Sequence, residues 1–200
     1  MTIKMVLDHL FLVTASVFFT VLAGVPLGVA AYLYPPVRKL ILRVTDILQT
    51  IPALALLGII MVFAGAGKAT VIVGLVLYSL LPVVHNTYLG LNQVDSGIKE
   101  AAMGMGMSRP YRLLRVELPL AFPVIFTGIR IATVTAIGVA VFSCFVGGGG
   151  LGAIIYRGIR IQNMSLILTG TATLMIMAVL FDGIMGYLEK LLYQRSHKTT

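Results

Sequence analysis

Residues 100–119 read EAAMGMGMSRPYRLLRVELP, the longest polar interval in a sequence that otherwise resembles membrane-spanning segments. The interval carries five charged side chains, Glu100, Arg109, Arg112, Arg115 and Glu117, and long apolar runs flank it on both sides. A polar segment held between two membrane spans has to lie in water, because lipid cannot satisfy its charges. We therefore expect residues 95–119 to form a polar helical elbow (hereafter the elbow) outside the bilayer.

The composition excludes a water-soluble globule. Of the 200 residues, 58% are hydrophobic and 11% are charged, whereas soluble domains carry about 25% charged residues. The net charge of +8 comes from short basic clusters between apolar runs, which is typical of juxtamembrane charge and not of nucleic-acid binding. Cys144 is the single cysteine, so a disulfide framework is excluded. The histidines His9, His85 and His197 are too dispersed to predict a metal site.

The apolar runs predict one all-α polytopic membrane domain over residues 1–200. A helix needs about 20 apolar residues to cross roughly 30 Å of hydrocarbon. Pro35 and Pro36 end the first run, Pro52 lies near the start of the second, and residues 147–160 are expected to be irregular. We expect five spans, at about residues 10–37, 47–67, 69–94, 120–146 and 165–188.

The distribution of lysine and arginine predicts the orientation in the membrane. With five spans, one side of the bilayer collects far more basic residues than the other, and that side is cytoplasmic. The elbow and the C-terminus are then expected inside the cell and the N-terminus outside. The residues expected inside are Arg38, Lys39, Arg43, Lys99, Arg109, Arg112, Arg115, Lys190, Arg195 and Lys198. Those expected outside are Lys4, Lys68, Arg157 and Arg160.

Within the elbow, the residues predict two short helices. Asp95 or Ser96 can cap the first helix, and the glycines at 104 and 106 are expected to end it. Ser108 can cap the second, with Pro110 tolerated in its first turn. Two functions remain open from these residues alone. The elbow is either an inert solvated connector or a docking knob, in which alanines allow close approach, methionines adapt to a partner and Glu100 offers an unpaired charge.

The spacing of the elbow resembles the EAA motif of ATP-binding-cassette importer permeases. Glu100-Ala101-Ala102 is followed after three residues by Gly106, then by Val116 (often isoleucine in that family) and by Leu118-Pro119. The resemblance implies a type I importer permease of MetI-like fold, in which this motif is a coupling helix that fits a cleft in a separate ATPase subunit. The coupling residues that it implies are Glu100, Ala101, Ala102, Met103, Gly106, Arg109 and Pro119.

Further segments resemble the branch of that family that imports quaternary amines such as glycine betaine, carnitine and choline. They include residues 51–55 (IPALA), 81–87 (LPVVHNT), 128–130 (GIR) and 148–152 (GGGLG). The resemblance implies a second permease subunit and an extracellular substrate-binding protein as partners. No GxxxxGK[ST] phosphate loop and no catalytic constellation occur in the sequence, so we expect a non-enzymatic chain that leaves ATP and Mg²⁺ to the ATPase. A methionine permease and an ATP-independent secondary transporter are the alternatives.

Among the polar residues inside the expected spans, four are candidates for a role in the translocation path. Arg130 and Asp182 are the charges deepest in apolar runs, where an unpaired charge facing lipid costs about 2.5–3.5 kcal/mol. They are expected either to pair with each other between the fourth and fifth spans or to line the translocation path or its gate. His85 and Asn86 follow Pro82 in the third span and are expected either to form interhelical hydrogen bonds or to line a cavity.

Overall fold

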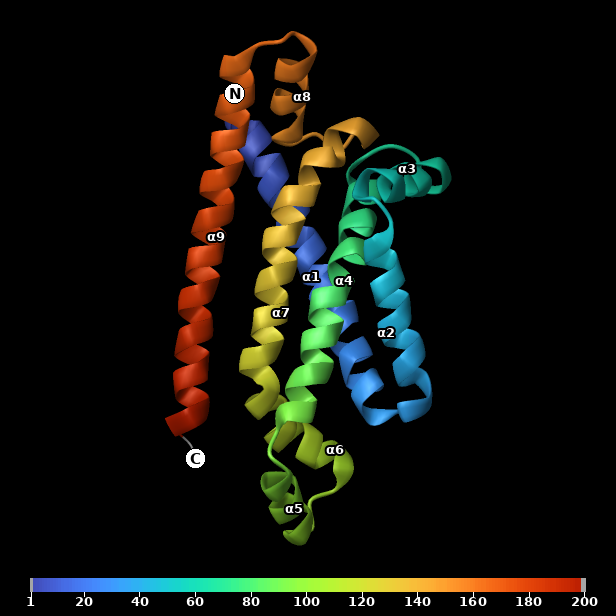
Figure 1. Cartoon of the computed structure of the whole chain (residues 1–200), viewed down its shortest axis with the longest axis vertical. Coiled ribbons are helices and arrows are strands. Elements are labelled where there is room, and N and C mark those ends of the chain that lie inside the picture. The colour runs from blue at the N-terminus through green and yellow to red at the C-terminus, as the bar shows by residue number, and fades with distance from the viewer. Residues whose placement is uncertain (1, 199–200) are drawn as a thin grey trace.

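The computed structural model describes residues 2–198, and the side chains of residues 195–198 are outside the description. The basic side chains of Arg195 and Lys198, which the orientation argument used, therefore lie outside the described part. The described chain is almost entirely helical (Figure 1). Its α-helices are α1 (Ile3–Leu33), α2 (Pro35–Thr50), α3 (Ala53–Ala64), α4 (Lys68–Gln93), α5 (Ser96–Gly104), α6 (Arg109–Arg112), α7 (Leu118–Val139), α8 (Gly152–Arg160) and α9 (Met164–Lys198). A π-helical segment, Leu113–Glu117, precedes α7, and a 3₁₀ segment, Ala140–Val146, follows it.

Four helical stretches within the described residues are long and apolar enough to cross a membrane, namely Ile3–Leu33, Lys68–Gln93, Arg109–Val146 and Met164–Gln194. A fifth crossing is counted if α2 and α3 together form one broken span. The all-α membrane class is confirmed. The expected second span over residues 47–67 is not one straight helix, because α2 and α3 meet at an angle of 100°.

Prolines explain both breaks in the first third of the chain. The residue before a proline is driven out of the α-helical region by steric clash, and Tyr34 (φ −122°, ψ 91°) and Ile51 (φ −71°, ψ 127°) are both extended. Pro35 and Pro36 then start α2, since proline is tolerated in a first helical turn. The first helix therefore ends at Leu33 and not at residue 37, and the basic residues that follow belong to α2.

The helices form an upright bundle with distinct ends (Figure 1). The elbow, carrying α5 and α6, projects from one end, where the α1–α2 junction and the last turns of α9 also lie. The first turns of α1 lie toward the other end, together with α3 and α8. The basic clusters that the sequence analysis assigned to one side therefore do gather at one end of the molecule.

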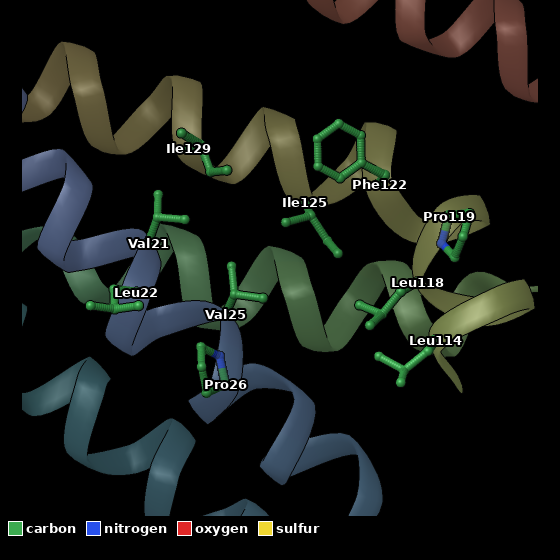
Figure 2. A pocket seen from close by; sticks show the side chains of 10 residues that line it. All are labelled: Val21, Leu22, Val25, Pro26, Leu114, Leu118, Pro119, Phe122, Ile125 and Ile129. Atoms are coloured by element: carbon green, nitrogen blue, oxygen red, sulfur yellow. The ribbon is translucent and has the colours of Figure 1, made fainter. Parts of the chain in front are cut away.

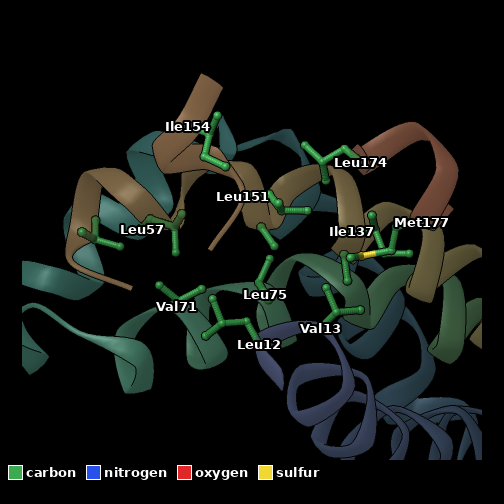
Figure 3. Packing of buried hydrophobic residues seen from close by; sticks show 13 residues of the cluster. Leu12, Val13, Leu57, Val71, Leu75, Ile137, Leu151, Ile154, Leu174 and Met177 are labelled. Atoms are coloured by element: carbon green, nitrogen blue, oxygen red, sulfur yellow. The ribbon is translucent and has the colours of Figure 1, made fainter. Parts of the chain in front are cut away.

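The core of the bundle lies toward the end that carries α3 and α8. Buried side chains from α1, α3, α4, α7, α8 and α9 meet there (Figure 3), and the central ones are Leu12, Leu57, Leu75, Ile137 and Leu151. Residues 152–160, expected to be irregular, form α8, and the residues before them make a turn in which three glycines have positive φ. The turn brings α8 back over the core.

Glycines set the closest helix contacts. In α1, Gly24 and Gly28 face α4 at the four-residue spacing of a small-residue helix interface. A methyl group on Gly28 would lie 2.5 Å from Cβ of Thr87 and 2.8 Å from the carbonyl oxygen of Val84. Gly128 of α7 makes a similar approach to α4, because a methyl group there would lie 2.5 Å from the carbonyl oxygen of Pro82. These contacts hold α1, α4 and α7 together.

The substitution Gly28→Ala tests this packing. We expect it to destabilise the bundle by about 1–3 kcal/mol, because α1 and α4 have to separate to admit the methyl group. The matched control is Gly138→Ala, since no atom lies within 4 Å of the added methyl there and alanine favours a helix. Unfolding of the purified protein in mixed micelles, followed by circular dichroism, measures both. Equal stability of the two variants would contradict the close α1–α4 contact.

Candidate coupling site and polar residues of the spans

The elbow is a compact helix–turn–helix. Asp95 caps α5, as predicted, by accepting a hydrogen bond of 3.1 Å from the backbone N–H of Ile98. Gly106 ends the turn with a φ of +78°, a left-handed conformation that suits glycine. No atom lies within 4 Å of a methyl group built on Gly106, so this backbone is open to an approaching partner. Ser108 then stands at the start of α6, although its side chain makes no capping hydrogen bond.

The expected coupling residues separate into exposed and buried ones. Glu100, Ala101 and Met103 are exposed on α5, and the exposed fraction of Met103 is 52%. Ala102 was expected to contact a partner. Its side chain is instead 2% exposed and faces into the chain. Of the expected coupling residues on α5, the exposed ones are therefore its glutamate, one alanine and a methionine.

Glu100 differs from every other acidic residue of the chain. The sequence contains seven aspartates and glutamates, and in the described structure the other six lie within 3.2 Å of a partner. Their pairs are Asp8–Lys68, Asp46–His85, Glu117–Arg112, Asp182–Arg130, Glu189–Arg130 and Asp95 with the backbone N–H of Ile98. Among the described residues, Glu100 has no such partner. An exposed carboxylate without an internal contact is available to a cation of another chain.

Arg109 and Pro119 lie further from the tip of the elbow. Nη2 of Arg109 donates a hydrogen bond of 2.9 Å to the carbonyl oxygen of Leu33, at the end of α1. Pro119 is in the first turn of α7 and helps to line an apolar groove of about 560 Å³ between α1 and α7 (Figure 2). Their predicted contact with a partner stays a prediction, and the structure shows that Arg109 also has a role inside the chain.

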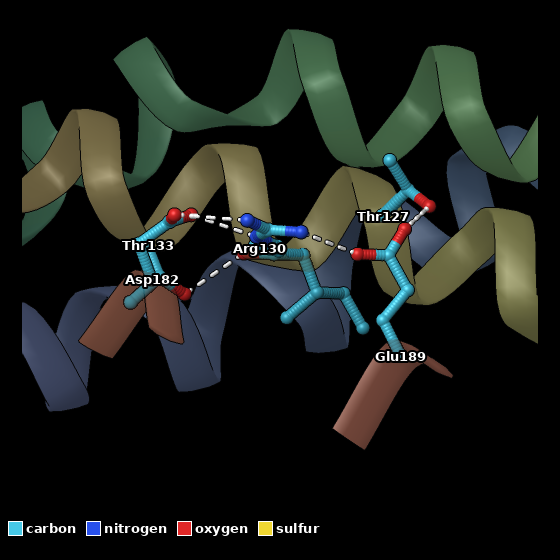
Figure 4. Close-up of polar contacts among 6 residues, drawn as sticks. Thr127, Arg130, Thr133, Asp182 and Glu189 are labelled. Atoms are coloured by element: carbon cyan, nitrogen blue, oxygen red, sulfur yellow. Dashed lines mark hydrogen bonds and ion pairs between the residues drawn. The ribbon is translucent and has the colours of Figure 1, made fainter. Parts of the chain in front are cut away.

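Arg130 and Asp182 form the ion pair that was one of the two alternatives expected for them. Nε and Nη2 of Arg130 donate to the two carboxylate oxygens of Asp182, at 2.7 and 2.8 Å, which joins α7 to α9 (Figure 4). Nη1 donates to Glu189 at 2.8 Å, and Thr127 donates to the same carboxylate. Glu189 was not among the predicted polar residues because the expected fifth span ends at residue 188, whereas α9 continues through Glu189. Its seven-residue spacing from Asp182, about two turns, was the available signal.

His85 and Asn86 behave differently from each other. Nε2 of His85 lies 3.2 Å from Oδ1 of Asp46 in α2, so it bridges two helices, although the contact lacks hydrogen-bond geometry. Asn86 donates to the carbonyl oxygen of Pro82, at 2.8 Å, within its own helix. The expected interhelical hydrogen bond is therefore wrong for Asn86. A role of either residue in a translocation path stays a prediction, as it does for Arg130 and Asp182.

Comparison with known families shows to which of them the chain belongs. The profile of the family described as "Binding-protein-dependent transport system inner membrane component" matches residues 20–193, which run from the second half of α1 into α9 and include the elbow. The chain belongs to this family. As a binding-protein-dependent membrane component, it is a multi-pass membrane protein, and its elbow follows the crossing stretch Lys68–Gln93 and leads into Arg109–Val146.

Curated relatives of this membrane component extend over most of its length. The glycine betaine/carnitine/choline transport system permease protein OpuCD of Bacillus subtilis is 43% identical over 185 residues, which cover 92% of this chain and 81% of the relative. The choline transport system permease protein OpuBD of the same organism is 40% identical over 193 residues, covering 96% and 85%. A solved structure, an inward-facing conformation of the MetNI methionine ABC transporter, matches with a TM-score of 0.88 at 24% identity, covering 95% of both chains. That likeness confirms the MetI-like fold.

Proposed function

We propose that this chain is the transmembrane permease subunit of an ATP-driven importer for osmoprotectant quaternary amines, in the class of glycine betaine, carnitine and choline. The observation that carries the proposal is Glu100, the one acidic residue in the described chain without an internal partner, presented on an exposed helix between spans. Relatives at 40–43% identity, whose names give those three amines as cargo, support the substrate class. The methionine transporter supports the fold alone, because its identity is 24%.

In the proposed complex, this chain and its partner proteins perform different steps of transport. A separate ATPase binds ATP and Mg²⁺ and receives α5 in a cleft, with Glu100, Ala101, Met103 and Gly106 at the contact. A second permease subunit, identical or paralogous, completes the translocation path, and an extracellular binding protein delivers the amine at the end that carries α3 and α8. The chain itself is not an enzyme. Its N-terminus lies outside the cell and its C-terminus in the cytoplasm, in accord with the basic clusters at the elbow end.

The transport step is alternating access between two conformations of the bundle. Closure of the ATPase pair displaces the elbow, and because the spans are packed through glycine contacts, the helices move as packed bodies toward an outward-open state. Such coupling is a free-energy difference between states and not a chemical step of this chain. The low-affinity path needs no aromatic cage, since the binding protein selects the amine.

The test is purification of the intact complex on a tag attached to this chain, followed by reconstitution into proteoliposomes. We expect an ATPase subunit to co-purify, and the binding protein loaded with glycine betaine, carnitine or choline to raise ATP hydrolysis and labelled uptake several-fold. Methionine is the matched control and is expected to have no effect. If methionine alone raised ATP hydrolysis and uptake, the chain would instead be a permease of a methionine importer. Uptake without ATP, with no ATPase in the preparation, would contradict the importer altogether.

A further inference from the structure

The elbow is attached to the ends of two spans by cationic side chains. Lys99 donates a hydrogen bond of 2.9 Å to the carbonyl oxygen of Leu91, near the end of α4. Arg109 donates to the carbonyl oxygen of Leu33, the last residue of α1. Carbonyls in the last turn of a helix lack an intrahelical donor and carry the negative end of the helix dipole. Two elbow cations thus satisfy the exposed ends of α1 and α4.

Tyr32 joins these contacts to the far side of the elbow. Nζ of Lys99 lies 5.3 Å from the centroid of the Tyr32 ring, within the range of a cation–π contact. Tyr32 and Leu33 also pack against a buried cluster that includes Leu91 of α4 and Leu113 of the π-helical segment. The last turn of α1 is therefore in contact with both sides of the elbow.

The pair of Arg112 and Glu117 depends on the π-helical turn. Nε of Arg112 lies 2.5 Å from Oε1 of Glu117, and the exposed fractions of the two side chains are 14% and 2%. In an α-helix five residues advance by about 500°, which places such a pair about 140° apart around the axis. The wider turn, with the N–H of Leu118 bonded to the carbonyl oxygen of Leu113, lets the two meet. Segments of this kind occur frequently at functional sites.

We propose that Lys99, Arg109, Arg112 and Glu117, together with Tyr32, form a clamp that makes the elbow and the last turn of α1 move as one body. The displacement that a partner imposes on α5 then reaches α1 directly, in addition to α7, which continues from the elbow. Arg112 and Glu117 are positioning residues in this clamp, because their side chains are largely buried and bond to each other within the chain. The inference rests on the proposed function and adds the route by which the elbow drives the spans.

The first test separates coupling from stability. In the reconstituted complex, we expect Glu117→Gln to lower choline uptake per ATP hydrolysed about tenfold, while the ATPase rate stays within twofold of the unmodified complex. The matched control is Arg115→Gln, an exposed residue in the same π-helical segment, which is expected to leave the ratio unchanged. Arg112→Lys keeps the charge, so its uptake per ATP hydrolysed is expected to lie between those of Glu117→Gln and the unmodified complex. An unchanged ratio in Glu117→Gln, or a parallel loss of complex, ATPase and uptake, overturns the clamp.

The second test uses a reversible cross-link and does not depend on a destabilised variant. Tyr34 and Pro110 line the same pocket of about 180 Å³ between the end of α1 and α6, and both are exposed. Tyr34→Cys with Pro110→Cys, in a Cys144→Ser background, is treated with a short reducible bifunctional thiol reagent. If α1 and the elbow move together, uptake stays within twofold of the untreated sample. A tenfold loss that reduction reverses overturns the clamp.

The two proposals fail in different ways. If the unmodified complex shows no ATP-driven uptake of glycine betaine, carnitine or choline, the proposed function is wrong and the clamp falls with it. If the unmodified complex transports and the cross-linked complex does not, the proposed function stands and the clamp alone is overturned.

Discussion

Replacing Glu100 by arginine is expected to abolish ATP-driven uptake while leaving the chain folded and inserted in the membrane. The fold is spared because Glu100 is exposed and has no partner among the described residues. The partner contact is lost because charge reversal turns attraction into repulsion. Breaking a close interfacial charge pair costs about 2–5 kcal/mol, which corresponds to at least about a thirtyfold weaker contact at 1.4 kcal/mol per factor of ten. Uptake into proteoliposomes and co-purification of the ATPase measure the effect.

The matched control is Gln93→Arg, which places an arginine at the exposed last residue of α4, outside α5. It is expected to transport normally, whereas Glu100→Gln should be intermediate. Gly106→Asp is expected to resemble the arginine variant, since its φ of +78° disfavours a side chain and the added carboxylate stands where the backbone is open. Normal ATP-driven uptake by both Glu100→Arg and Gly106→Asp would disprove the coupling role of the elbow.

The second large effect is expected at Arg130. Its replacement by leucine leaves Asp182 and Glu189 without their cation between α7 and α9. Uncompensated charges within a spanning helix cost about 2.5–3.5 kcal/mol each at the centre of the bilayer, so the variant is expected to accumulate poorly and to lose the attachment of α9. Quantities of membrane-inserted protein and protease protection of α9 measure this. Asp182→Asn should be milder, because Glu189 still accepts from the guanidinium.

A charge exchange gives the decisive control for this pair. Arg130→Asp with Asp182→Arg alone would place the new aspartate beside Glu189 and create repulsion. The exchange is therefore made with Glu189→Gln, and this triple variant is expected to recover most of the accumulation that Arg130→Asp loses. Failure to recover, with the double exchange equally poor, would mean that the ion pair does not hold α7 to α9.

The membrane class and most spans followed from the sequence because long apolar runs have few structural solutions. The third expected span, residues 69–94, differs from α4 by one residue at each end. The second expected span, residues 47–67, is bent in the structure, because Pro52 and the extended residue before it interrupt the helix at a position that hydropathy does not reveal. The nine residues of α8 were missed because the adjacent glycines indicated an irregular segment, and their helix is stabilised by packing on the core through Ile154.

The site was predictable to the extent that it depended on spacing along the chain. The cap at Asp95, the turn at Gly106 and the unpaired state of Glu100 are local properties, and each follows from residues within a few positions. Contacts between distant segments were not predictable in this way. Arg109 to the end of α1 and Glu189 to Arg130 join residues that are 76 and 59 positions apart, and only the packed helices bring them together.

The pairing of six of the seven acidic residues has a consequence for how the chain meets the lipid surface. The surplus of basic side chains at the elbow end attracts anionic phospholipid headgroups, at about 1 kcal/mol per lysine or arginine near the surface. The exposed carboxylate of Glu100 repels those headgroups. The tip of α5 is thereby kept clear of the bilayer that the neighbouring arginines attract, so that this carboxylate stays in water and accessible to another protein.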